Sequence, residues 1–352
     1  MKECSIKYPL RFHPILKQTI WGGERIVPFL SLDTEVVETI GGGDGKHIGE
    51  CWAVSAIKGS ESVVDGGCLN GASLCELMNS FGEALVGKKN FERFGNEFPL
   101  LVKFIDAAQD LSVQVHPNDE LAAERHGCSG KTEMWYVLDP KEDAMLMSGF
   151  AGEVTKEDYC RMTADQIVGS LQKYKISQGD MFYLPAGTIH SIGAGAFIAE
   201  IQQSSDITYR IYDYNRKDKD GNYRELHTAL AAEAIDFSQN NNSKVEHSHL
   251  FTDSSNAWDY AVKAVDCEHF VTYLFNLGNS GSESEKRLQF DYAALDSFVL
   301  ITCTDGRCSL KYDGDNALEV SKGDVLLLPA DLKSVEFVVE ADSSCEFLET
   351  HI

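Results

Sequence analysis

The 352-residue chain lacks several features that mark common classes of protein. Its ten cysteines include no CxxC pair, so neither a zinc knuckle nor a redox dithiol is indicated, and we expect scattered, reduced thiols. No apolar run approaches the length of a membrane span. The first residues, Met1 to Pro9, are too charged to begin a secretory signal, so we expect a cytoplasmic protein.

Basic residues are also scarce. The chain has 31 Lys and Arg against 55 Asp and Glu, and its formal net charge is −24. This balance argues against nucleic acid and against anionic membranes as partners. Because dissolved salt screens charges that are more than about 8–10 Å apart, an anionic ligand would have to be held by basic residues close to it.

Two sequence motifs resemble functional sites but are not interpreted as such. A glycine-rich segment ends at Lys46, but Ile40 stands where a P-loop requires glycine, and His47 stands where it requires Ser or Thr. A flexible loop is the simpler interpretation. His247 and His249 lie in a polar stretch and are interpreted as incidental histidines.

Short apolar strands and two helical insertions alternate along the chain. Strands are predicted at residues 98–105, 111–115, 133–138, 181–184 and 196–201. A capping-box pattern begins each insertion, at Ser73 with Glu76 and at Thr155 with Asp158. The apolar positions that follow at helical spacing are Leu74, Leu77, Met78, Phe81 and Leu85 in the first insertion, and Tyr159, Met162, Ile167 and Leu171 in the second. Both helices are expected to pack outside a barrel.

An internal repeat predicts a mainly β fold with two barrels. The Gly-Asp, apolar strand and Pro-Ala pattern of residues 179–186 recurs at 323–330. Size and a 43% hydrophobic content also favour two domains. The polar run 238–244 suggests the boundary, so we expect a first domain at 1–240 and a second at 250–352.

Four potential metal ligands occur in three segments. Gln114 and His116 lie two apart on a predicted strand and so share one face, and Glu133 and His190 follow later in the chain. Imidazole, carboxylate and amide donors without a thiolate suit a catalytic zinc or another first-row ion with an open position. The spacing alone does not separate zinc from iron or manganese. Each residue taken singly could be structural.

These segments resemble, in the same order, the short bacterial form of the type I phosphomannose isomerases, which belong to the cupin superfamily. The Gln-x-His pair, a Glu shortly after a Lys and a distant His agree with that family's zinc ligands. Residues 19–23, 48–52 and 206–214 agree as well, and the resemblance covers roughly residues 8–230. It implies two cupin-type jelly-roll barrels. In the second, Ser334 stands at the position equivalent to His190, so this barrel is expected to be metal-free.

The resemblance also implies an activity and a set of site residues. The activity is a zinc-dependent aldose–ketose isomerisation of mannose 6-phosphate and fructose 6-phosphate through a cis-enediol, with one Zn²⁺ per chain. The implied metal ligands are Gln114, His116, Glu133 and His190. The expected catalytic residues are Lys131, Glu200 and Arg210, and the expected substrate-binding residues are Ser112, Lys103, Lys131 and Arg210. Lys131 could instead be a surface residue, and Glu200 a structural ion-pair partner.

Two other functions use the same residues. A non-haem iron cupin that activates oxygen could share this ligand set. A sugar-phosphate-binding cupin without turnover could keep the barrel. The presence of Lys131, Glu200 and Arg210 beside the metal ligands argues against the second alternative, because binding alone needs no proton-transfer group. The sequence makes no prediction of oligomeric state.

Overall fold

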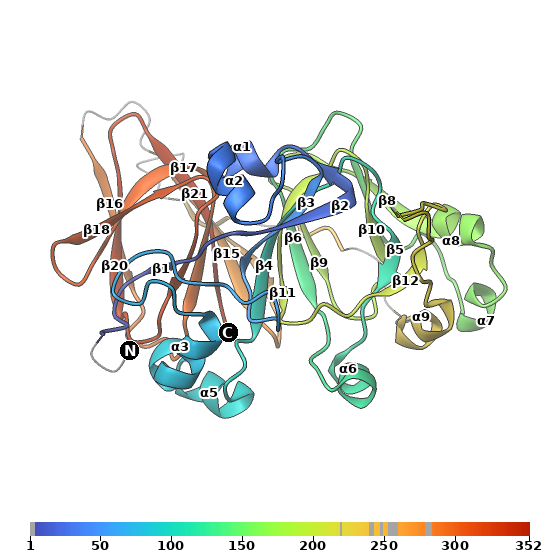
Figure 1. Cartoon of the computed structure of the whole chain (residues 1–352), viewed down its shortest axis with the longest axis horizontal. Coiled ribbons are helices and arrows are strands. Elements are labelled where there is room, and N and C mark those ends of the chain that lie inside the picture. The colour runs from blue at the N-terminus through green and yellow to red at the C-terminus, as the bar shows by residue number, and fades with distance from the viewer. Residues whose placement is uncertain (1–3, 219, 239–242, 247–248, 253–259, 279–283) are drawn as a thin grey trace.

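The structure, a computed structural model, describes residues 4–218, 220–238, 243–246, 249–252, 260–278 and 284–352. The chain is mainly β, as predicted, and its two halves lie side by side along the longest axis (Figure 1). We call them the N-terminal half, up to residue 246, and the C-terminal half, from residue 249. In the described part of the chain, no helix is long and apolar enough to cross a membrane.

The N-terminal half contains two antiparallel sheets. The six-stranded sheet has the order β2-β3-β4-β11-β6-β9. Its strands are β2 (Ile15–Gly23), β3 (Ile48–Val54), β4 (Leu100–Asp106), β6 (Glu133–Val137), β9 (Met181–Leu184) and β11 (Phe197–Gln203). The five-stranded sheet has the order β12-β5-β10-β7-β8. Its strands are β5 (Val113–Val115), β7 (Met145–Phe150), β8 (Leu171–Lys175), β10 (His190–Ile192) and β12 (Tyr209–Tyr212).

The two sheets face each other across an apolar core, but they do not form the closed barrel that was predicted. Trp135 and Ile198 of the six-stranded sheet pack in one cluster with Leu146 and Ile192 of the five-stranded sheet. Among the described residues, no strand pairing joins the two sheets. The chain passes between them several times through connections such as 107–112 and 185–189 instead of continuing a ladder. Side-chain packing therefore closes the interior, and the sheets stay open.

The C-terminal half is built on one ten-stranded sheet, whose edge strand β1 comes from the N-terminal half. Its strands are β1 (Leu10–Arg11), β13 (His249–Thr252), β14 (Tyr260–Asp266), β15 (Val271–Gly278), β16 (Lys286–Asp291), β17 (Val299–Tyr312), β18 (Asn316–Ser321), β19 (Val325–Leu328), β20 (Ser334–Val339) and β21 (Ser344–His351). The first part of β17 pairs with β19 and β21, and its second part with β18 and β20.

This sheet bends at Gly306, which has a φ of 73°. A Cβ there would lie 2.0 Å from the carbonyl oxygen of Ser344, so the bend requires glycine. The bend folds the sheet over a second apolar core that includes Ile301, Phe337 and Phe347. As in the N-terminal half, the result is a curved open sheet and not the predicted closed barrel.

The helices are short and lie on the outside of the sheets (Figure 1). They are α1 (Ile26–Phe29), α2 (Thr34–Thr39), α3 (Leu74–Phe81), α4 (Glu83–Val86), α5 (Lys88–Phe94), α6 (Asp119–His126), α7 (Lys156–Tyr159), α8 (Ala164–Ser170) and α9 (Thr228–Ala234). Both predicted capping boxes are present, at the starts of α3 and α7.

The apolar residues predicted to lie on one helix are divided, in each insertion, between two or more separate helices and strands. Gly82, with a φ of 44°, ends α3, so Leu85 belongs to the separate helix α4. In the second insertion, Thr163 and Gln166 form another capping box and start α8. Leu171 follows as the first residue of β8. A second cap signal inside an apolar stripe thus divides the predicted helix into two.

The sequence repeat is also a structural repeat. In the first copy, Val137 donates its amide proton to the carbonyl of Asp180 at 2.9 Å, ahead of β9. In the second, Cys303 donates to the carbonyl of Asp324 at 2.9 Å, ahead of β19. The same turn therefore leads into the same kind of strand in each half.

The halves share an apolar core. Leu10 of β1 pairs with Leu327 of β19, and one cluster contains Leu10 and Phe98 together with Phe298 and Leu348. The proposed domain boundary at 238–244 includes residues 239–242, which lie outside the described residues. His247 also lies outside them.

All ten cysteines are free thiols, as expected.

Candidate metal and active site

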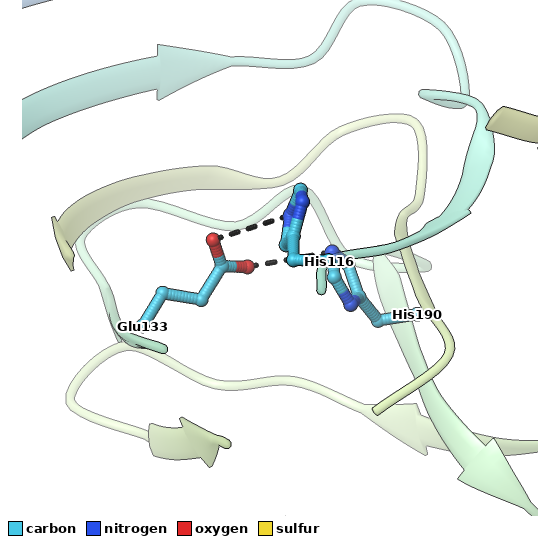
Figure 2. A group of neighbouring side chains, drawn as sticks. All are labelled: His116, Glu133 and His190. Carbon is cyan, nitrogen blue, oxygen red and sulfur yellow. Dashed lines mark ion pairs between the residues drawn. The ribbon is translucent and has the colours of Figure 1, made fainter. Parts of the chain in front are cut away.

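Three of the four predicted metal ligands converge in the N-terminal half. His116 follows β5, Glu133 opens β6 and His190 opens β10, so both sheets contribute (Figure 2). All three side chains are buried, and their donor atoms lie within 4.8 Å of one another. The two oxygens of Glu133 lie 3.5 Å from Nε2 of His116 and 3.4 Å from Nε2 of His190.

Backbone carbonyls orient both imidazole rings. Nδ1 of His116 lies 2.8 Å from the carbonyl oxygen of Ile207, and Nδ1 of His190 lies 2.8 Å from that of Thr188. Because a carbonyl only accepts, each Nδ1 is assigned the proton, and each Nε2 presents a lone pair towards Glu133. Burial lowers the pKa of His190 to about 4 and the pKa of His116 well below its usual value. Both rings are therefore neutral near pH 7.

Gln114, the fourth predicted ligand, lies directly beside this group. It is the strand partner of His190 across β5 and β10, and its amide nitrogen lies 3.3 Å from Nε2 of His190. The hydroxyl of Ser112 donates to the amide oxygen of Gln114 at 3.1 Å. Rotation of the amide group would exchange its oxygen and nitrogen, so Gln114 can present an oxygen at the same place.

The donors fit a divalent metal ion. Oε1 of Glu133 is buried and has no hydrogen-bond partner among the described residues. Burial and the charge of Glu200 raise the pKa of Glu133 to about 7. A dication in contact with Glu133 would satisfy this oxygen and favour the ionised carboxylate. Two neutral imidazoles with carboxylate and amide oxygens form a set that zinc and other first-row ions accept.

Lys131 lies against the same group, as its spacing from Glu133 predicts. Its buried ammonium is 2.5 Å from Oε2 of Glu133, 3.1 Å from Nε2 of His116 and 3.6 Å from Oε1 of Glu200. Burial by itself would lower the pKa of Lys131. The carboxylates of Glu133 and Glu200 outweigh burial and raise it, so the lysine is a cation.

Glu200 lies between two buried lysines. Its Oε1 is 3.6 Å from Lys131 and 3.4 Å from Lys103, its strand partner across β4 and β11. Nε1 of Trp135 donates to its other oxygen at 2.9 Å. Burial opposes ionisation, but the two lysines and the indole outweigh it and lower the pKa of Glu200. Glu200 is therefore an ionised carboxylate inside the protein.

Lys131 and Glu200 open onto one pocket of about 360 Å³, which is within the usual range for small-molecule sites, whereas His116, Glu133 and His190 lie behind its lining. It brings together six of the residues singled out in the sequence, namely Lys103, Ser112, Gln114, Lys131, Glu200 and Arg210. Sequence reasoning assigned no role to Trp21, Glu50 or Arg224, which also line it. Trp21 and Glu50 lie in segments that carried the family resemblance, whereas Arg224 had no sequence signal.

Arg210 projects from β12, where it pairs with Gln114 of β5. Its Nη1 donates to the carbonyl of Glu225 at 3.1 Å. Its Nε is buried without an acceptor among the described residues. Burial and the nearby Arg224 lower the pKa of Arg210 from its very high ordinary value. A cation with an unsatisfied donor therefore borders the pocket.

Comparisons with known proteins extend over nearly the whole chain. The family described as phosphomannose isomerase type I, catalytic domain, matches residues 10–153. Mannose-6-phosphate isomerase ManA of Bacillus subtilis is 36% identical over 96% of this chain and 97% of its own. The crystal structure of the mannose 6-phosphate isomerase from Bacillus subtilis is similar, with a TM-score of 0.81, 31% identity, and coverage of 98% of this chain and 99% of that one. A mannose 6-phosphate isomerase solved with zinc and yttrium has the same fold, with a TM-score of 0.72, 15% identity, and coverage of 97% and 99%.

Proposed function

The chain belongs to the type I phosphomannose isomerase family, and from this premise we propose that it interconverts mannose 6-phosphate and fructose 6-phosphate. The observation that carries the proposal is the placement of Glu200. This ionised carboxylate lies between Lys103 and Lys131, in the pocket that Gln114 also lines. An aldose–ketose isomerisation requires a proton acceptor and positive charge near the sugar oxygens, and this cavity combines both with one proposed metal ligand, Gln114.

We further propose one Zn²⁺ per chain, held by Gln114, His116, Glu133 and His190. Support comes from the donor set itself, with its two neutral imidazoles and the buried oxygen of Glu133 that lacks a partner. When bound, zinc supplies Lewis-acid polarisation of the sugar oxygens. The carbonyls of Ile207 and Thr188 keep both Nε2 atoms directed at the metal position.

The proton transfer is assigned to Glu200. Its carboxylate takes the proton from C2 of the open-chain aldose and returns it to C1, while the hydroxyl proton moves from O2 to O1 through the cis-enediol. The ammonium of Lys131, 3.6 Å from Glu200, stabilises negative charge that develops on the sugar oxygens. Lys103 and the indole of Trp135 hold Glu200 in its ionised form.

The proposed domains are a catalytic cupin-type domain at residues 1–240 and a second, metal-free cupin-type domain at 250–352. The repeated turn before β9 and β19 supports two copies of one unit. The repeat also aligns Leu184 with Leu328. Because Glu133 pairs with Leu184 and Val299 with Leu328, a valine takes the place of the metal-ligating carboxylate in the second copy.

A coupled assay of mannose 6-phosphate isomerisation on the purified full-length protein tests the activity, with elemental analysis of the same sample. We expect turnover, one equivalent of zinc, and loss of turnover on chelation that zinc restores. Bound iron with substrate-dependent oxygen uptake would favour the oxygenase instead. Tight binding of the sugar phosphate by a zinc-loaded sample that shows no turnover would favour a binding protein.

A further inference from the structure

Two arginines hold one buried carboxylate next to the pocket, and a third arginine lies near them. Asp213, only 4% exposed, accepts hydrogen bonds from Nε of Arg224 at 2.7 Å and from Nη2 of Arg216 at 2.5 Å. Nη2 of Arg224 also donates to Asp213. Arg210 lies close enough for the charges of Arg224, Asp213 and Arg216 to shift its pKa. The group therefore has three positive charges against one buried negative charge.

This excess of positive charge is unusual in a chain with a net charge of −24. The carboxylate of Glu225 also acts on Arg210, but its side chain is 84% exposed and hence strongly screened. Local repulsion and burial both raise the free energy of the group, and a bound anion would lower it.

The two lysines of the pocket are balanced in a different way. Lys103 lies 3.7 Å from Glu50 and 3.4 Å from Glu200, and Lys131 lies 2.5 Å from Glu133 and 3.6 Å from Glu200. Two ammonium groups thus face three carboxylates. Each of these ammonium groups is therefore already paired with carboxylates, whereas the arginine group keeps an excess of positive charge beside the pocket.

Of the three arginines, Arg210 and Arg224 line the pocket. Arg216 does not; its Nη1 donates to the carbonyl of Asp110 at 2.5 Å, and its guanidinium lies over the ring of Tyr214. Arg224 uses Nε and Nη2 to hold Asp213, which leaves its Nη1 without an acceptor among the described residues. The buried Nε of Arg210 also lacks an acceptor in the described part of the chain. Each of the two guanidinium groups at the pocket therefore keeps a donor available.

We propose that Arg224 and Arg210 together bind the phosphate group of the substrate, and that Asp213 positions Arg224 for this contact. Paired guanidinium groups match the oxygens of a phosphate in charge and in geometry. The reacting carbons of the sugar then lie towards Glu200 and Lys131. The inference rests on the proposed function. It also changes the expected role of Lys103, which keeps Glu200 ionised and does not bind the phosphate.

Isothermal titration of inorganic phosphate into the zinc-loaded full-length protein tests the proposal. Arg224→Gln should raise the dissociation constant at least about tenfold, the usual worth of a charge-assisted hydrogen bond. The KM for mannose 6-phosphate should rise by a similar factor while kcat changes less than about threefold. Inhibition by mannitol, which has no phosphate, should stay the same. Unchanged phosphate affinity in this variant would overturn the proposal.

Arg216→Gln is the matched control, because it removes another guanidinium from Asp213 but none from the pocket. Its phosphate affinity should stay within about threefold of the parent protein, as expected for a charge that makes no direct contact. Equal weakening in Arg216→Gln and Arg224→Gln would mean that Arg224 only supports Asp213, and would overturn the proposal. If Arg216→Gln does not fold, Arg224→Lys takes its place. That variant keeps the charge and should bind phosphate more tightly than Arg224→Gln; equal binding by the two would again count against the proposal.

The titration separates this inference from the isomerase proposal. If phosphate binding depends on Arg224 but the protein has no isomerase activity, the proposed function is wrong and the proposed phosphate site stands. If isomerisation is normal but phosphate binding does not depend on Arg224, the proposed phosphate site is wrong and the proposed function stands.

Discussion

A buried glutamate occupies corresponding positions in β11 of the N-terminal half and β21 of the C-terminal half. In the N-terminal half, Glu200 of β11 pairs with Trp135 of β6. In the C-terminal half, Glu349 of β21 pairs with Ile301 of β17. The repeated turn and strand align Trp135 with Ile301, because their partners in β9 and β19 are separated by the offset of the sequence repeat. Glu349 is therefore the structural counterpart of Glu200.

Neighbouring residues and burial shift the pKa values of these two carboxyl groups in opposite directions. Lys103 lies opposite Glu200, whereas Tyr273 lies opposite Glu349. With two lysines nearby, the pKa of Glu200 is lowered. Burial raises the pKa of Glu349 to about 7, although the hydroxyl of Tyr292 donates to it at 2.7 Å. The same place in a repeated fold thus carries a carboxyl that is either ionised or only partly ionised near pH 7, depending on whether buried cations face it.

The largest expected effect comes from removing the C-terminal half. Deletion after residue 245 strips β19 from β1 and exposes the shared core around Leu10 and Phe98. We expect an insoluble or unfolded fragment, because an exposed apolar face of this kind drives aggregation. Expression of the fragment with measurement of its soluble fraction checks this. A soluble fragment that unfolds cooperatively and keeps its metal would show that the N-terminal half is an independent domain.

The next largest effect is expected at the proposed metal ligands. His190→Ala should lose bound zinc and reduce turnover at least about 10²-fold, since even changes beyond the ligands of a metal site cost about 10–100-fold. Ser334→Ala changes the corresponding first residue of β20 and should alter neither. Elemental analysis with the isomerase assay gives both readouts. Two tightly bound zinc ions per parent chain, one of which survives in His190→Ala, would contradict a metal-free second half.

How far sequence reasoning reached depended on the range of the interactions involved. Motifs predicted the group of His116, Glu133 and His190, because each residue lies in a distinctive local segment. Arg224 gave no signal, since it reaches the pocket only through the loop after β12 and its contacts with Asp213. The five strands that were predicted lie within a few residues of β4, β5, β6, β9 and β11, and the other strands were not predicted. The open, facing sheets were not predicted either, because strand pairing across distant segments leaves no local pattern.

Glu200→Gln and Glu349→Gln compare the two carboxylates directly. Glu200→Gln keeps shape and hydrogen bonding but cannot accept a proton, so turnover should fall about 10²–10⁴-fold with metal retained. Glu349→Gln should leave turnover within about twofold, because this residue lies in the core of the other half and touches no group of the pocket. Steady-state kinetics and metal content of both variants give the comparison. Near-normal turnover in Glu200→Gln would place the base elsewhere.

The smallest expected effect is on the pH dependence of stability. The pKa of Glu349 rises from its ordinary 4.5 to about 7 in the folded protein, so the folded state binds more protons than the unfolded state between these values. Folding stability from this group is therefore complete below about pH 4.5, falls as pH rises, and is lost above about pH 7. The loss is at most about 3.5 kcal/mol, from about 1.4 kcal/mol per pKa unit over about 2.5 units.

Glu349→Gln removes this term, since an amide does not titrate. Urea unfolding of the chelated parent and variant at several pH values between 4.5 and 8 measures the difference, in which contributions from all other titrating groups cancel. The variant should gain stability relative to the parent as pH rises through this window, and the gain should level off above about pH 7. A difference independent of pH would show that Glu349 ionises at its ordinary pKa. The contrast with Glu200 would then lie in the position of the carboxyl and not in its charge.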